Sequence, residues 1–144
     1  MFESAELGHK IDKETFKKEV PLLRAALLDA QYDMLEKKDF PVVILISGVD
    51  GSGKGETINL LYSWMDPRHI STLAFSEPSD EERARPYMWR YWRALPPQGK
   101  IGIFAGSWYS QPIADRIVGN MRRSEMDDRL DETNRIEVKL GSEA

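Results

Sequence analysis

The chain has 144 residues, which suits one domain that can bury a core. Hydrophobic residues make up 41% and charged residues 31%, a balance typical of soluble globular proteins, and the absence of cysteine excludes disulfides. The net charge is −4, so no general positive field favours nucleic acid, and any polyanion must be held by a local cationic patch.

The N-terminal third predicts a leader and then helix. Residues 1–12 are expected to form a loosely held leader, and residues 13–144 a single domain. From Lys13 to about Lys37, apolar residues recur at three- and four-residue spacings, which predicts an amphipathic helix. Pro21 interrupts this pattern, so we expect either two helices or one helix that begins near Pro21.

The rest of the chain alternates between strand and helix patterns. Strands are expected over residues 42–47, 70–75 and 100–104, with Gly102 interrupting the third. Helices are expected over residues 54–65, from about residue 79 through Trp89 and Trp92, over 112–121, and over the highly charged 128–140. This alternation predicts an α/β fold with a parallel sheet and right-handed crossovers.

The segment Gly48-Val49-Asp50-Gly51-Ser52-Gly53-Lys54 follows the first predicted strand and precedes a helix. Glycines let backbone N–H groups curl around phosphate oxygens, while the lysine and the helix N-terminus add positive charge. Gly55 stands where a Ser or Thr hydroxyl usually holds magnesium. The predicted phosphate-binding residues are Gly48, Gly51, Ser52, Gly53, Lys54 and Gly55; the alternative is a glycine-rich turn in an ordinary α/β unit.

Four segments in matching order resemble the polyphosphate kinase 2 family. They are residues 48–55, Glu77-Pro78-Ser79-Asp80-Glu81-Glu82, Trp89-Arg90-Tyr91-Trp92-Arg93-Ala94-Leu95-Pro96, and Ile103-Phe104-Ala105-Gly106-Ser107-Trp108-Tyr109. The resemblance implies a P-loop NTPase-like three-layer fold. It also implies phosphoryl transfer between inorganic polyphosphate and a nucleotide, with Mg2+. The chain is most similar to family members of the polyphosphate:AMP phosphotransferase type, in which two copies are fused and the N-terminal copy has drifted from the active pattern.

The resemblance assigns roles to three residues. Lys54 is expected to contact the transferring phosphoryl oxygens, and Asp50 to bind the metal, with a loop-stabilising turn carboxylate as the alternative for Asp50. Arg90 matches a phosphate-contacting position, although an ordinary surface arginine is the alternative. Trp89, Trp92 and Trp108 are expected to serve in packing.

Two positions depart from the active pattern. Ala105 and Gly106 replace an acid that would hold magnesium and an arginine that would bind phosphate. The resemblance also implies that Glu77 stands where some members carry lysine, which would put negative charge near the anionic donor. Because one electrostatic group at such a site is commonly worth about two to three orders of magnitude in rate, we expect phosphate binding to survive and catalysis to be weak.

The family sheet has the order 2-3-1-4-5, and this sequence supplies candidates only for strands 1 to 3. Strands 4 and 5 and the lid are expected to be missing, which leaves residues 42–46 at an open edge. We therefore expect a longer polypeptide with a C-terminal active domain, or self-association.

Other patterns are weak. His9 and His69 are far apart in the sequence, which argues against a zinc site. Ser107 does not lie in a nucleophile elbow. Arg122-Arg123 is expected to be solvated surface, and the alternative is a minor role along a polyphosphate path. No secretory signal and no membrane-length apolar run is present, so a cytoplasmic location without membrane or nucleic-acid partners is expected.

Three functions remain at this point. The first is a polyphosphate-dependent nucleotide phosphotransferase with AMP or ADP as its nucleotide. The second is a non-catalytic polyphosphate-binding domain that docks an active copy. The third is a P-loop kinase that uses ATP on a small metabolite, which lacks a recognisable lid or adenine pocket.

Overall fold

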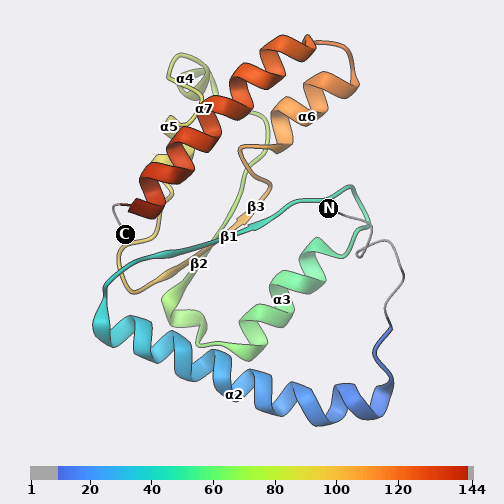
Figure 1. Cartoon of the computed structure of the whole chain (residues 1–144), viewed down its shortest axis with the longest axis vertical. Helices are drawn as coiled ribbons and strands as arrows, with labels where there is room; N and C mark the ends of the chain where they lie inside the picture. The colour runs from blue at the N-terminus through green and yellow to red at the C-terminus, as the bar shows by residue number, and fades with distance from the viewer. Residues whose placement is uncertain (1–9, 143–144) are drawn as a thin grey trace.

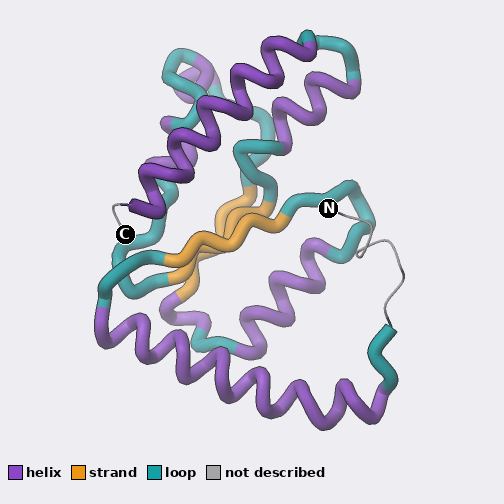
Figure 2. Tube along the Cα trace, in the orientation of Figure 1, coloured by secondary structure: helices purple, strands orange, loops and turns teal. Residues whose placement is uncertain are grey.

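Three parallel strands form the centre of the molecule, in the order β1-β3-β2 (Figure 2). The strands are β1 (Val42–Ile46), β2 (Ile70–Ala74) and β3 (Ile101–Ala105). Ile46 of β1 and Ala74 of β2 both align with Ala105 of β3, so all three strands end at the same edge of the sheet. The expected α/β class and the order 2-3-1 are confirmed, and β1 lies at an edge of this sheet.

The coordinates are a computed structural model that describes residues 10–142. The leader expected over residues 1–12 lies mostly outside these residues. In chain order the other elements are α2 (Lys13–Lys37), α3 (Lys54–Trp64), the 3-10 turn η1 (Pro67–His69), α4 (Asp80–Arg83), α5 (Trp89–Trp92), α6 (Ser110–Ile117) and α7 (Arg123–Ser142). Within the described part of the chain, no helix has the length and apolar character needed to cross a membrane.

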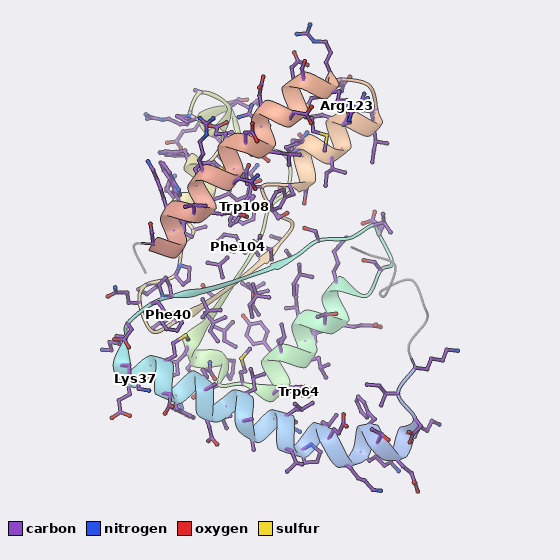
Figure 3. The ribbon with its side chains drawn as sticks, in the orientation of Figure 1. Lys37, Phe40, Trp64, Phe104, Trp108 and Arg123 are labelled. Carbon is purple, nitrogen blue, oxygen red and sulfur yellow. The ribbon has the colours of Figure 1, made fainter. Side chains whose placement is uncertain are left out.

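Helices cover both faces of the sheet, giving three layers (Figure 1). Alternating side chains on a strand point to opposite faces. Ile101 and Ile103 therefore pack with residues of α2 and α3, such as Leu27 and Leu61. Phe104 points the other way. It lies 6.3 Å from Trp108, ring to ring, on the face covered by α5 and α7 (Figure 3).

Helix α2 runs unbroken through Pro21, so both expected alternatives, two helices or one helix beginning near Pro21, were wrong. The Asp12 side chain caps the helix by accepting from the backbone N–H groups of Glu14 and Thr15, each at 2.9 Å. Proline removes one intrahelical hydrogen bond, but Pro21 is exposed, and the C-terminal half of α2 is anchored by packing on α3 and the sheet. Tertiary contact therefore overrides the local cost.

Three further expectations needed correction. The helix expected from residue 79 through Trp92 is two short helices, α4 and α5, and Trp92 is 53% exposed rather than packed. Gly102 does not interrupt β3: a Cβ there would come within 3.0 Å of Pro96, so glycine permits a close approach. Helix α7 begins at Arg123 rather than residue 128, and it buries Thr133.

Candidate functional site

The glycine-rich loop leaves the C-terminal end of β1 and enters α3 at Lys54 (Figure 1). Gly51 and Gly53 adopt φ values of 78° and 86°, which only glycine takes readily. A Cβ at Gly48 would collide with the Ser52 hydroxyl. No side chain caps α3, since its N-cap is Gly53, so the N–H groups of its first turn are available to an anion.

Lys54 lies folded over this loop. Its ammonium group donates hydrogen bonds to the carbonyl of Gly48 and, at 3.1 Å, to that of Val49. It also lies 3.8 Å from Asp50 Oδ1, and the Asp50 side chain is fully exposed. The loop residues predicted from the sequence are thus brought together, with Lys54 close to the groups that would meet phosphate.

A hydroxyl cluster of Ser47, Ser107 and Ser110 lies beside the loop, and the sequence alone did not reveal it. Ser47 Oγ donates to Ser107 Oγ at 2.9 Å, and the Ser110 hydroxyl accepts from the Ser107 N–H at 2.9 Å. Ser47 follows β1 directly and Ser107 lies two residues beyond β3. The cluster could have been predicted from the rule that neighbouring parallel strands end at the same edge of a sheet, because Ser47 and Ser107 both lie just after strands.

Arg90 is not part of the loop. Its guanidinium donates to the Ser76 carbonyl at 3.0 Å and lies over the rings of Phe75 and Tyr91 at 5.2 and 5.7 Å. The side chain is only 11% exposed. Nε is 3.4 Å from Glu82 Oε1, an ion-pair distance without hydrogen-bond geometry, so this buried N–H has no acceptor among residues 10–142.

Glu82 is held as a carboxylate. The Ser79 N–H donates to it at 2.8 Å as part of a capping box at the start of α4. This hydrogen bond, and the charge of Arg90, lower the pKa of Glu82 below its usual value. The partner of Arg90 is therefore negative at neutral pH.

Helix α7 fixes the segment that follows β3. The Glu137 carboxylate accepts from Trp108 Nε1 at 2.9 Å and from the Tyr109 hydroxyl at 2.7 Å. Burial and this hydrogen bond raise the pKa of Tyr109, so the phenol stays protonated. Tyr87 donates to the Trp108 carbonyl, and burial raises its pKa as well. Trp108 is 4% exposed, in agreement with its predicted packing role.

The backbone conformation just after β3 favours glycine at position 106. Gly106 has φ of 87°, and a Cβ would lie 3.2 Å from the Phe75 carbonyl. Its N–H donates to Ile46 at 2.9 Å, which ties the end of β3 to β1 just before the loop. In this conformation the position does not readily accept an arginine.

The described residues offer Mg2+ a single loop carboxylate rather than a cluster of acids, and Mg2+ at phosphate sites commonly takes one or two carboxylates together with phosphate oxygens. No group of three or more His, Cys, Asp or Glu side chains gathers within residues 10–142. Asp50, the expected ligand, is a lone exposed carboxylate beside Lys54, and neither Gly55 nor Ala105 has a side-chain oxygen. His9 lies outside the described residues, and His69 lies 3.9 Å from Asp66.

Comparisons with known proteins show the family of this chain. The model of the family described as Polyphosphate kinase 2 (PPK2) matches residues 10–144. Polyphosphate:AMP phosphotransferases from Pseudomonas aeruginosa and Pseudomonas syringae pv. tomato are 52% and 47% identical over 143 residues, or 99% of this chain. The chain spans 29% of the length of each.

Solved structures show the same fold. A crystal structure from Pseudomonas aeruginosa PA01, described as a polyphosphate kinase 2, superimposes with a TM-score of 0.92 at 51% identity, over 99% of this chain and 30% of that one. Polyphosphate Kinase 2 from Arthrobacter aurescens TC1 superimposes with a TM-score of 0.86 at 24% identity, over 95% of this chain and 50% of that one. The chain belongs to the polyphosphate kinase 2 family.

Proposed function

We propose that the loop from Gly48 to Gly55 binds inorganic polyphosphate, and that the chain serves phosphoryl transfer from polyphosphate to AMP while turning over weakly or not at all by itself. The observation that carries this proposal is a loop with positive-φ glycines, uncapped helix amides and Lys54, in a member of this family. We place this function in the cytoplasm, as the sequence leads us to expect.

The reaction demands charge neutralisation. An AMP phosphate oxygen attacks the terminal phosphorus of the chain, and the bond to the bridging oxygen breaks, so negative charge builds on the leaving chain. The α3 amides and Lys54 would stabilise that charge. No acid or arginine follows β3 to assist, because Ala105 and Gly106 stand there. This accounts for a site that binds its ligand without efficient turnover.

Lys54→Ala tests the binding half of the proposal. We expect loss of measurable binding of pyrophosphate and polyphosphate in calorimetry, because the only loop ammonium is removed. Lys37→Ala is the matched control, since Lys37 is a 66% exposed lysine of α2 that pairs with Asp33 at 3.9 Å. Equal affinities of Lys54→Ala and the unaltered chain would mean that the loop is merely a turn.

Turnover is measured separately, as AMP-dependent ADP formation from polyphosphate. We expect this chain to be slower than the Pseudomonas aeruginosa polyphosphate:AMP phosphotransferase by about two orders of magnitude or more, because side chains that would neutralise charge are absent. Equal rates per molecule would contradict the weak site.

A non-catalytic polyphosphate-binding domain that docks an active copy is the second candidate. The residues at 105 and 106 favour it, because Gly106 combines a positive φ with a close backbone neighbour. Polyphosphate binding with no ADP formation at any enzyme concentration would support this candidate over weak catalysis.

A further inference from the structure

An arginine-rich cavity lies apart from the phosphate loop, between the α4–α5 segment and α7. Its volume is about 380 Å³. Four arginines and two glutamates provide its charged lining, namely Arg83, Arg85, Arg90, Arg129, Glu77 and Glu82. We call it the arginine cavity. It concentrates positive charge locally in a chain whose net charge is −4.

Aromatic rings hold several of these guanidinium groups in place. Arg129 lies over the Tyr87 ring at 4.7 Å, and Arg85 over the Trp89 ring at 5.5 Å. A guanidinium stacked by its face keeps its N–H edge available to an oxyanion. Arg90 brings a buried N–H without an acceptor among the described residues. Intramolecular partners do exist, since Arg129 pairs with Glu132 at 3.0 Å and Arg83 with Asp80 at 3.2 Å.

The cavity is connected to the phosphate loop through polar groups. A second cavity of about 220 Å³ shares Glu77, Tyr87, Arg90 and Gln111 with it, and also reaches Ser107 and Ser110. Those two serines contact Ser47, the residue immediately before Gly48. The carboxyl edge of the sheet thus carries donors from the loop at β1, across β3, to the cavity beyond β2.

We propose that the arginine cavity binds the distal phosphates of a polyphosphate chain whose end occupies the phosphate loop. This inference rests on the proposed function and extends it to a second contact region. A ligand with a charge on every repeat matches several guanidinium groups in succession, each able to make charge-assisted hydrogen bonds. Arg85 and Arg129 are the residues that the proposal newly assigns to ligand binding.

The test compares a short and a long ligand. In the double variant Arg85→Gln/Arg129→Gln we expect affinity for long-chain polyphosphate to fall about tenfold or more, and affinity for pyrophosphate to change by less than about twofold. Arg135→Gln is the control: it removes the same charge from α7, and Arg135 is six residues from Arg129, on a different side of the helix. Arg129→Lys keeps the charge and is expected to retain most of the affinity.

The outcomes separate this inference from the proposed function. Equal losses for pyrophosphate and long chains, or no loss for either, would overturn the distal site while leaving the loop in place. Absence of pyrophosphate binding by the unaltered chain would instead refute the proposed function. Thermal unfolding of each variant identifies any that lost its fold. Glu77→Gln provides an independent check, because it removes a negative charge from the arginine cavity and should strengthen long-chain binding. Unchanged affinity of Glu77→Gln would count against the proposal.

Discussion

The backbone conformation of Gly106 limits which side chains fit at the end of β3. Its φ of 87° lies in the left-handed region, and the Phe75 carbonyl would lie 3.2 Å from an added Cβ. The backbone at this position therefore favours glycine, apart from any effect of side-chain charge. Grafting an arginine onto position 106 would have to displace the junction between β2 and β3.

Gly106→Ala should accordingly destabilise the chain. We expect a loss of about 1–2 kcal/mol in the free energy of unfolding, the usual cost of a left-handed conformation for a residue with a Cβ. Gly141→Ala is the control, because Gly141 is helical with open space around it, and alanine there should stabilise by about 0.5–1 kcal/mol. Denaturant titration measures both, and equal effects of the two changes would contradict a strained Gly106.

At the scale of elements, a buried side-chain amide of α2 makes two hydrogen bonds to the segment between α3 and β2. Gln31 is 3% exposed, and its Nε2 donates to the Asp66 carbonyl at 2.9 Å while its Oε1 accepts from the Asp66 N–H at 2.7 Å. Asp66 lies between α3 and β2, so this pair ties the first helix to the crossover that leads into the sheet. Buried amides with both partners satisfied specify how elements dock.

Gln31→Met keeps the size of the side chain and removes both hydrogen bonds. We expect a loss of about 1–3 kcal/mol in the free energy of unfolding, because the Asp66 N–H would be buried without a partner, whereas the Asp66 carbonyl still accepts from the His69 N–H at 3.2 Å. Gln98→Met changes an exposed glutamine with a single long contact of 3.5 Å and should have little effect. If Gln31→Met and Gln98→Met unfold at the same denaturant concentration, the Gln31 hydrogen bonds do not stabilise the docking of α2.

Some of the elements could be predicted from the sequence and others could not. The three strands and the glycine-rich turn depend on local pattern and lie close to their predicted positions, whereas the order of the sheet was expected from the family resemblance. Pro21 was misjudged because packing of the later half of α2 outweighs one lost hydrogen bond. Arg129 could not be placed beside Tyr87 from sequence, since 42 positions separate them and only the packing of α7 brings them together.

At the scale of the whole molecule, charge distribution and net charge act in opposite directions on a polyanion. The net charge of −4 repels such a ligand at long range, whereas Lys54 and the arginine cavity would, on our proposal, attract it at short range. Contact with cationic side chains also releases condensed counterions from the ligand, which favours binding and makes the affinity depend on salt. The sign of the salt dependence therefore tells which of the two effects governs binding.

We expect the affinity for long-chain polyphosphate to fall as salt rises. If Lys54, Arg85 and Arg129 each neutralise one phosphate, the slope of log affinity against log salt should be about −2, by analogy with single-stranded nucleic acids. Removing either Arg85 or Arg129 should make the slope shallower by about 0.7, whereas Arg135→Gln should leave it unchanged. Affinity that increases with salt would mean that repulsion by the acidic surface dominates, and that local cationic contacts do not hold the ligand.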